Sequence, residues 1–184
     1  MSHDFLRRIS VSSAIDRSKT LDGFLDTVVL NDLDRMIHKC ELHYLGFSIM
    51  GSVIELLGAV LDKKDFHKEG VSSARFKAAI RKLEAFKAYR GFIGGKPDLH
   101  DLYAHMRSGM AHVVLCGKGV AFTQRTDKVD GVSHLQVKSF SDGTTRLILV
   151  SEDLYEDIRK AVVEIRSKKS CKSRLKQEFM NPSL

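Results

Sequence analysis

Apolar residues recur every three or four positions through most of the chain. This period is typical of helices that bury one face against a core. One clear stripe consists of Phe76, Ile80, Leu83 and Phe86. The spacing predicts helices over 21–40 and 44–61, a third that begins at a capping Ser72 or Ser73, a fourth that opens with Asp98 and frays near Gly109, and a last one capped by Ser151.

The stretch 44–61 is almost wholly apolar, and Glu55 is its single charged residue. It is shorter than the roughly 20 residues that a membrane span usually needs, it contains three glycines, and charged residues flank it on both sides. We therefore expect no membrane crossing. The pattern favours a central core helix, or one that also forms a subunit interface.

Glu55 has two interpretations, because a carboxylate on an apolar helix is costly to desolvate. It lies at the one wet edge of the helix, or it lines an internal cleft and accepts a hydrogen bond from a basic side chain nearby. The sequence leaves both open.

Beyond the fourth helix the period changes to that of strands. Short runs at 120–125, 134–140 and 146–150 predict strands, and Asp142-Gly143 between the last two is a strong hairpin signal. The predicted fold class is mainly α. We expect a bundle of about four to five helices with a small antiparallel hairpin or sheet inserted before the C-terminal helix.

A chain of 184 residues with 43% hydrophobic content can bury one substantial core. We expect one domain over 21–169, with the β insertion at about 119–150. An extension at 1–20 precedes this domain, and a basic tail at 170–184 follows it.

The formal net charge of +7 makes acidic partners plausible, above all RNA or nucleotides. Opposite its apolar stripe, the third predicted helix carries a row of basic residues, from which we take Arg75, Arg81 and Lys82 as candidates for nucleic-acid contacts. A solvated basic face is the usual alternative for such a row.

The cysteines Cys40, Cys116 and Cys171 are odd in number, widely spaced and without a CxxC pair. This pattern argues against a disulfide framework and against a structural zinc site. The first residues also lack a long apolar run before a cleavage site. We expect a cytoplasmic protein that uses neither a metal nor a cofactor.

The fourth helix sets three histidines and one arginine beside a buried stripe. The histidines, His100, His105 and His112, have offsets that do not align on one helical face, so they do not predict a metal site. Arg107 and His112 are about 140° apart on an ideal helix. A groove between two protomers, or a helix that ends before His112, would bring them together.

The phrase Leu102-Tyr103-x-x-Met106-Arg107-x-Gly109-Met110-x-His112 resembles a stretch of the HEPN superfamily (higher eukaryote and prokaryote nucleotide-binding domains). The ribonuclease members of this superfamily carry an arginine, roughly four to six residues, and then a histidine. The upstream segment 51–58 is similar to a segment of uncharacterised bacterial HEPN-like proteins. This chain departs from the pattern at Ser108, because active members usually carry Asn, Asp or His directly after the arginine.

The resemblance implies a metal-independent endoribonuclease of the toxin or defence type, acting at the interface of a homodimer. His112 would serve as general acid or base, a role that suits a group titrating near neutrality. Arg107 would stabilise charge on the phosphoryl oxygens. Ser108, Glu55 and Tyr103 would support the site, with Tyr103 either stacking on a base or packing in the core.

Two other interpretations remain open. A non-catalytic HEPN-like module would bind RNA or nucleotide, or serve only for dimerisation, and Ser108 favours this reading. Alternatively, Arg107 pairs with Glu55 or Asp101 and has a purely structural role, while His112 caps a carbonyl.

Overall fold

Helix α4 (His43–Leu61) lies at the centre of the fold and contacts most of the other elements. The computed structural model describes Leu25 and residues 29–62, 64–65, 68–94, 99–127 and 132–168. The remaining helical elements are α3 (Asn31–Asp34), the π-helix η2 (Arg35–Lys39), α5 (Ser72–Lys82), the 3-10 helix η3 (Glu84–Phe92), the π-helix η4 (Tyr103–Ser108), α6 (Gly109–Val113) and α7 (Ser151–Ser167).

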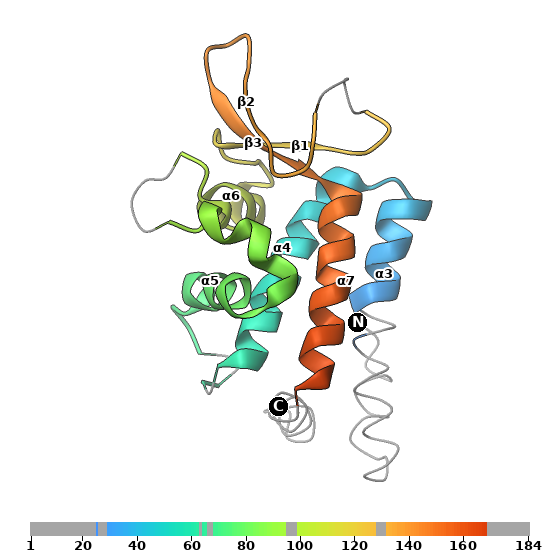
Figure 1. Ribbon diagram of the computed structural model, residues 1–184, viewed down its shortest axis with the longest axis vertical. Helices are drawn as coiled ribbons and strands as arrows, with labels where there is room; N and C mark the ends of the chain where they lie inside the picture. Colours follow the sequence, from blue (N-terminus) through green and yellow to red (C-terminus); the bar gives the residue numbers. More distant parts are fainter. Residues whose placement is uncertain are drawn as a thin grey trace.

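The predicted class is confirmed: the protein is mainly helical, with a small sheet before the last helix. Figure 1 shows this sheet across one end of the helices, with α7 running away from it. The prediction of a core helix at 44–61 is also confirmed. The length and hydropathy of α4 would suit a membrane span, but 56% of that stretch is buried inside the fold, as in the core helix of a soluble protein.

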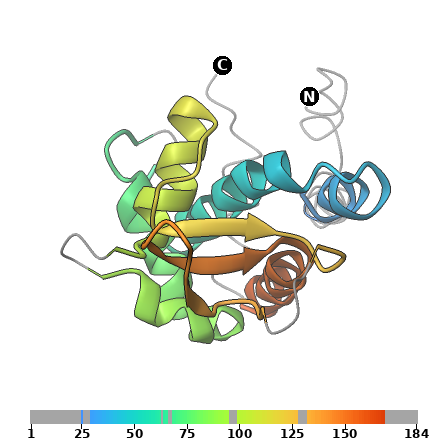
Figure 2. The same ribbon diagram turned by 90° about the horizontal axis from the view of Figure 1, so that it is seen from above.

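The sheet is mixed rather than antiparallel, which corrects the sequence prediction. Its strands are β1 (Val120–Thr123), β2 (Val137–Ser139) and β3 (Thr145–Val150), in the order β1-β3-β2. The β2–β3 hairpin forms as predicted, with Gly143 at φ 78°, whereas β1 pairs parallel to β3 on its other side. The central place of β3 explains its continuous buried run from Leu147 to Val150. Figure 2 shows β1 and β3 side by side from above, pointing in the same direction.

The third predicted helix is interrupted at Leu83, where the backbone is extended (ψ 130°) and separates α5 from η3. The predicted stripe nevertheless holds, because Phe76, Ile80, Leu83 and Phe86 are all fully buried. Helix α5 approaches α4 closely at Gly58, where an added Cβ would lie 1.9 Å from the carbonyl oxygen of Arg75. Only glycine fits at this contact.

Two predicted caps differ in the structure, and a third is not tested. Neither Ser72 nor Ser151 caps its helix, and both hydroxyls donate instead to glutamates, Glu55 and Glu152. Asp98 lies outside the described residues. The cap of the fourth helix is Asp101, whose Oδ1 accepts a hydrogen bond from the Ala104 backbone N–H at 2.9 Å.

Candidate functional site

Arg107 lies on η4, directly against α4. Its neighbour on α4 is Gly51, where an added Cβ would come within 3.2 Å of the Arg107 Cδ and 3.3 Å of the Met106 Cε. The absence of a side chain at Gly51 therefore gives Arg107 room to lie across the surface of α4. The π-helical turns of η4 widen the backbone here, a feature that is frequent at functional sites.

Glu55 joins three elements at this point. Its Oε2 accepts a hydrogen bond from Nε of Arg107 at 3.0 Å, and its Oε1 accepts one from Oγ of Ser72 at 2.6 Å. The side chains of Arg107 and Glu55 are only 20% and 19% exposed. Of the second interpretation of Glu55, the hydrogen bond from a nearby basic side chain is therefore present.

The ion pair uses only one side of the guanidinium. Glu55 contacts Nε of Arg107, and within the described parts of the chain no residue bonds to its two terminal amino groups. A guanidinium held in this way is fixed in position and still has the N–H donors of both terminal amino groups, which can bind two oxygens of a phosphate. The structural pairing and the phosphate-binding role are thus compatible.

His112 lies one helical segment further on, in α6, and is exposed. The helix ends two residues later at Val114, whose φ of 55° is left-handed. No described residue forms a hydrogen bond or ion pair with His112, so the predicted carbonyl cap is absent there. At about 1.5 Å per residue, His112 lies roughly 7 Å along the helix axis from Arg107, and no direct contact joins the two.

The other candidate residues near Arg107 have contacts within the fold. The ring of Tyr103 packs edge-on against Phe76 at 5.7 Å, in agreement with the packing alternative. Ser108 is half-buried at the end of η4. His100 Nδ1 lies 3.0 Å from the carbonyl oxygen of Gly119. Within the described part of the chain, no three His, Cys, Asp or Glu residues lie together in a way that could hold a metal ion.

The predicted basic face needs one correction. Arg75 is 4% exposed, so it does not belong to a nucleic-acid surface. Its Nε donates to Asp62 at 2.9 Å, and its guanidinium also donates to the carbonyl oxygen of Asp65. Arg75 thereby fixes the connector between α4 and α5. Arg81 and Lys82 are exposed, as the prediction requires.

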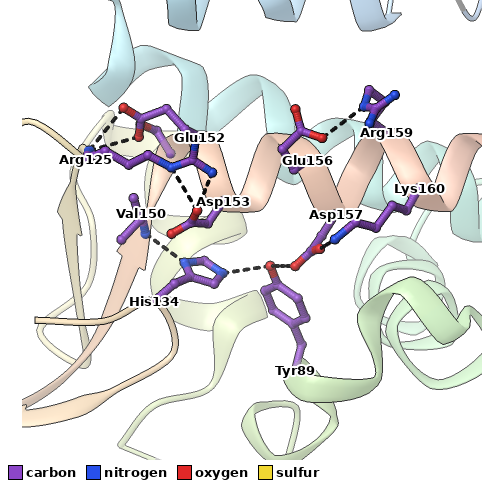
Figure 3. Close-up of polar contacts among 11 residues, drawn as sticks. Tyr89, Arg125, His134, Val150, Glu152, Asp153, Glu156, Asp157, Arg159 and Lys160 are labelled. Atoms are coloured by element: carbon purple, nitrogen blue, oxygen red, sulfur yellow. Dashed lines mark hydrogen bonds and ion pairs between the residues drawn. The ribbon is translucent and has the colours of Figure 1, made fainter.

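A partly buried hydrogen-bond chain beneath the sheet was not predicted (Figure 3). The Val150 N–H donates to Nδ1 of His134 at 2.9 Å, which leaves the proton on Nε2. Nε2 then donates to the Tyr89 hydroxyl at 2.8 Å, and this hydroxyl donates to Asp157 at 2.9 Å. Burial raises the pKa of Tyr89, and the nearby negative charge of Asp157 adds a smaller effect in the same direction. The sequence contains little sign of this chain, because its four residues lie on β3, η3, α7 and the loop before β2.

A second unpredicted cluster surrounds the start of α7. Glu152 is 7% exposed and accepts hydrogen bonds from the Arg125 backbone N–H and from the Ser151 hydroxyl. Burial alone would raise the pKa of Glu152, but these donors outweigh it and lower the pKa below the ordinary 4.5. Figure 3 shows Arg125, whose guanidinium also pairs with Asp153 at 2.6 Å.

Comparison with protein-family models, curated proteins and solved structures finds no match for this chain.

Proposed function

We propose that this protein is a HEPN-like, metal-independent endoribonuclease that acts as a homodimer, with Arg107 and His112 as its catalytic residues. The observation that carries the proposal is the way Arg107 is held. Glu55 fixes the guanidinium through Nε, and both terminal amino groups are left without a bond to any described residue. The exposed His112 follows on the next helical segment.

In the proposed reaction, the 2′-hydroxyl oxygen of RNA attacks the adjacent phosphorus, and the bond from phosphorus to the 5′ oxygen breaks. The products are a 2′,3′-cyclic phosphate and a 5′-hydroxyl. One copy of His112 accepts the proton of the 2′-hydroxyl, and the second copy protonates the leaving oxygen. The terminal N–H groups of Arg107 stabilise the negative charge on the phosphoryl oxygens.

A dimer is required to bring two copies of His112 to one phosphate. The Tyr44 hydroxyl ties α4 to the chain after α6, because it donates to the Val114 carbonyl at 3.1 Å and accepts from the Cys116 N–H at 3.3 Å. Exposed apolar groups on neighbouring segments mark interaction surfaces. On these two segments, and at the residue before α4, the large exposed apolar side chains are Leu42, Tyr44, Leu45, Ile49, Val114 and Leu115.

A second candidate, a non-catalytic HEPN-like RNA-binding module, is favoured by one observation. The carboxylate of Glu55 lies 3.0 Å from Nε of Arg107 and offsets the positive charge of the guanidinium. Arg107 therefore stabilises a negative charge that develops on the phosphoryl oxygens less strongly. Such a module would bind RNA in a salt-dependent manner without turnover.

The test is incubation of purified protein with mixed RNA in EDTA. We expect the wild type to produce cyclic-phosphate ends, and Arg107→Ala to lose about 100-fold or more of the rate. The Arg159→Ala variant removes an exposed arginine of α7 and is the matched control, which should cleave like the wild type. An Ile49→Asp variant, monomeric by light scattering, should also lose cleavage.

Binding of RNA by the wild type without cleavage would replace the nuclease proposal with the binding module. Equal loss of activity in Arg107→Ala and Arg159→Ala would contradict any special role of Arg107.

A further inference from the structure

A cavity of about 220 Å³ lies between the start of α4 and the end of β1, apart from Arg107. It is smaller than the roughly 300–1,000 Å³ that pockets for drug-sized ligands usually have. A head group of a few atoms fits such a space, whereas a whole nucleotide does not. The chemistry of the lining decides which head group.

Aromatic rings form one side of the cavity. Phe47 and Phe122 stack with their ring centres 4.0 Å apart, and Tyr44 meets Phe122 edge-on at 5.7 Å. The Tyr44 hydroxyl is already bonded to the backbone after α6, which fixes the ring and uses its polar end. Phe47 is fully buried, so the aromatic surface that a ligand can reach is that of Phe122 and Tyr44, and aromatic rings attract cations.

Hydrogen-bond acceptors form the other side. Glu41 and Asp127 contribute two carboxylates to the lining. Gln124 also lines the cavity, and its amide nitrogen donates to Asp127 at 2.6 Å, so the remaining group of Gln124 is its carbonyl oxygen. Among the described lining residues there is neither a lysine nor an arginine.

His43 adds a further acceptor because of a buried relay. The Ser151 hydroxyl gives its proton to Glu152 at 2.8 Å, so it can only accept from Nδ1–H of His43, at 2.7 Å. Ser151 is fully buried and Glu152 is 7% exposed, which fixes this arrangement. In the neutral ring, Nε2 then carries a lone pair, and no described residue bonds to it.

From this lining we infer that the cavity binds an organic cation with a guanidinium or alkylammonium head group. Such a group has only donors, which match the carboxylates, the Gln124 carbonyl and the His43 ring nitrogen, and its charge suits the aromatic faces. The N-terminus of α4 carries about half a positive charge, which disfavours a bound cation. The two carboxylates outweigh that effect. The same head group can come from a small molecule or from an arginine or lysine side chain of a partner.

The test is an NMR titration of the isotope-labelled full chain at constant ionic strength. The probes are butylguanidinium and butylammonium, with uncharged 1-butanol as the length-matched control. We expect both cations to bind with a Kd of about 1 mM and to shift the amide signals of residues 41–47 and 122–127. A capped Gly-Arg-Gly peptide is a further probe that distinguishes the two sources of the head group. If the peptide has a lower Kd than butylguanidinium, the ligand is an arginine or lysine side chain of a partner protein. If its Kd is higher, the ligand is a small molecule.

The double variant Glu41→Gln/Asp127→Asn should weaken cation binding about tenfold or more. Glu69→Gln, which removes an exposed carboxylate elsewhere, should bind like the wild type. Unchanged signals outside these segments would show that each variant is folded. Equal binding of 1-butanol, an unaffected double variant, or the absence of localised shifts would overturn the inference.

Discussion

His134 and His112 show how differently two regions of this protein use the same side chain. His134 takes part in a chain that runs from the Val150 N–H through Tyr89 to Asp157, and both of its ring nitrogens are engaged. His112 is exposed at the end of α6, and no described residue bonds to it. The first histidine supports the fold. The second is accessible to a ligand.

Two arginines repeat the contrast. Arg75 is 4% exposed and holds Asp62 and the carbonyl of Asp65, so its donors serve the connector between two helices. Arg107 pairs with Glu55 through Nε alone. A residue type therefore does not mark a site by itself. What marks it is the donor or acceptor capacity that the fold has not used.

The largest change in stability should come from Arg75→Ala. It removes a buried guanidinium and leaves the largely buried carboxylate of Asp62 without its arginine, which we expect to cost about 3 kcal/mol of the free energy of unfolding. Denaturant unfolding measures this loss, with the exposed Arg159→Ala as the control at about 0–0.5 kcal/mol. Similar values for the two variants would contradict a structural role that is specific to Arg75.

Tyr89→Phe should cost about 1–2 kcal/mol, because it removes the hydroxyl that joins His134 to Asp157 and with it two hydrogen bonds. Tyr155→Phe is the matched control, since the Tyr155 hydroxyl makes only a long 3.5 Å bond to the Leu30 carbonyl. Thermal unfolding should show a drop of about 2–4 °C per kcal/mol for a chain of this size. A Tyr89→Phe variant as stable as Tyr155→Phe would show that the chain contributes little.

Glu152→Gln should cost about 1 kcal/mol at neutral pH, through its lost charged hydrogen bonds. The folded state lowers the pKa of Glu152, so its contribution is present above the ordinary value of 4.5 and disappears as the pH falls through the lower folded value. Stability curves of the wild type and the variant should therefore converge in acid. A constant difference down to low pH would contradict this assignment.

The sequence predicted the parts of the fold that depend on the local spacing of apolar residues and on turn residues. The helix at 44–61, the stripe of the third helix and the Asp142-Gly143 hairpin follow from spacing and turn chemistry alone. The parallel pairing of β1 and the burial of Arg75 depend on contacts between distant segments. The spacing of apolar residues within one segment does not encode such contacts. The caps failed for a similar reason: Ser72 and Ser151 found carboxylate partners that outcompete their own helix ends.

The candidate site was predictable in part. The pairing of Glu55 with a basic residue was one of two alternatives, and the structure selects it. The Ser72 hydroxyl on the same carboxylate, and the space that Gly51 leaves for Arg107, could not be read from spacing. They depend on how α5 and η4 meet α4.

The most direct test of the contrast between the two histidines is the rate of RNA cleavage in EDTA, measured together with the free energy of unfolding. We predict that His112→Ala loses at least about 100-fold of the rate and less than about 0.5 kcal/mol of stability. Tyr89→Phe, assayed where it is folded, should keep the wild-type rate while losing stability. Cleavage that survives in His112→Ala, or a rate that falls equally in both variants, would contradict the account.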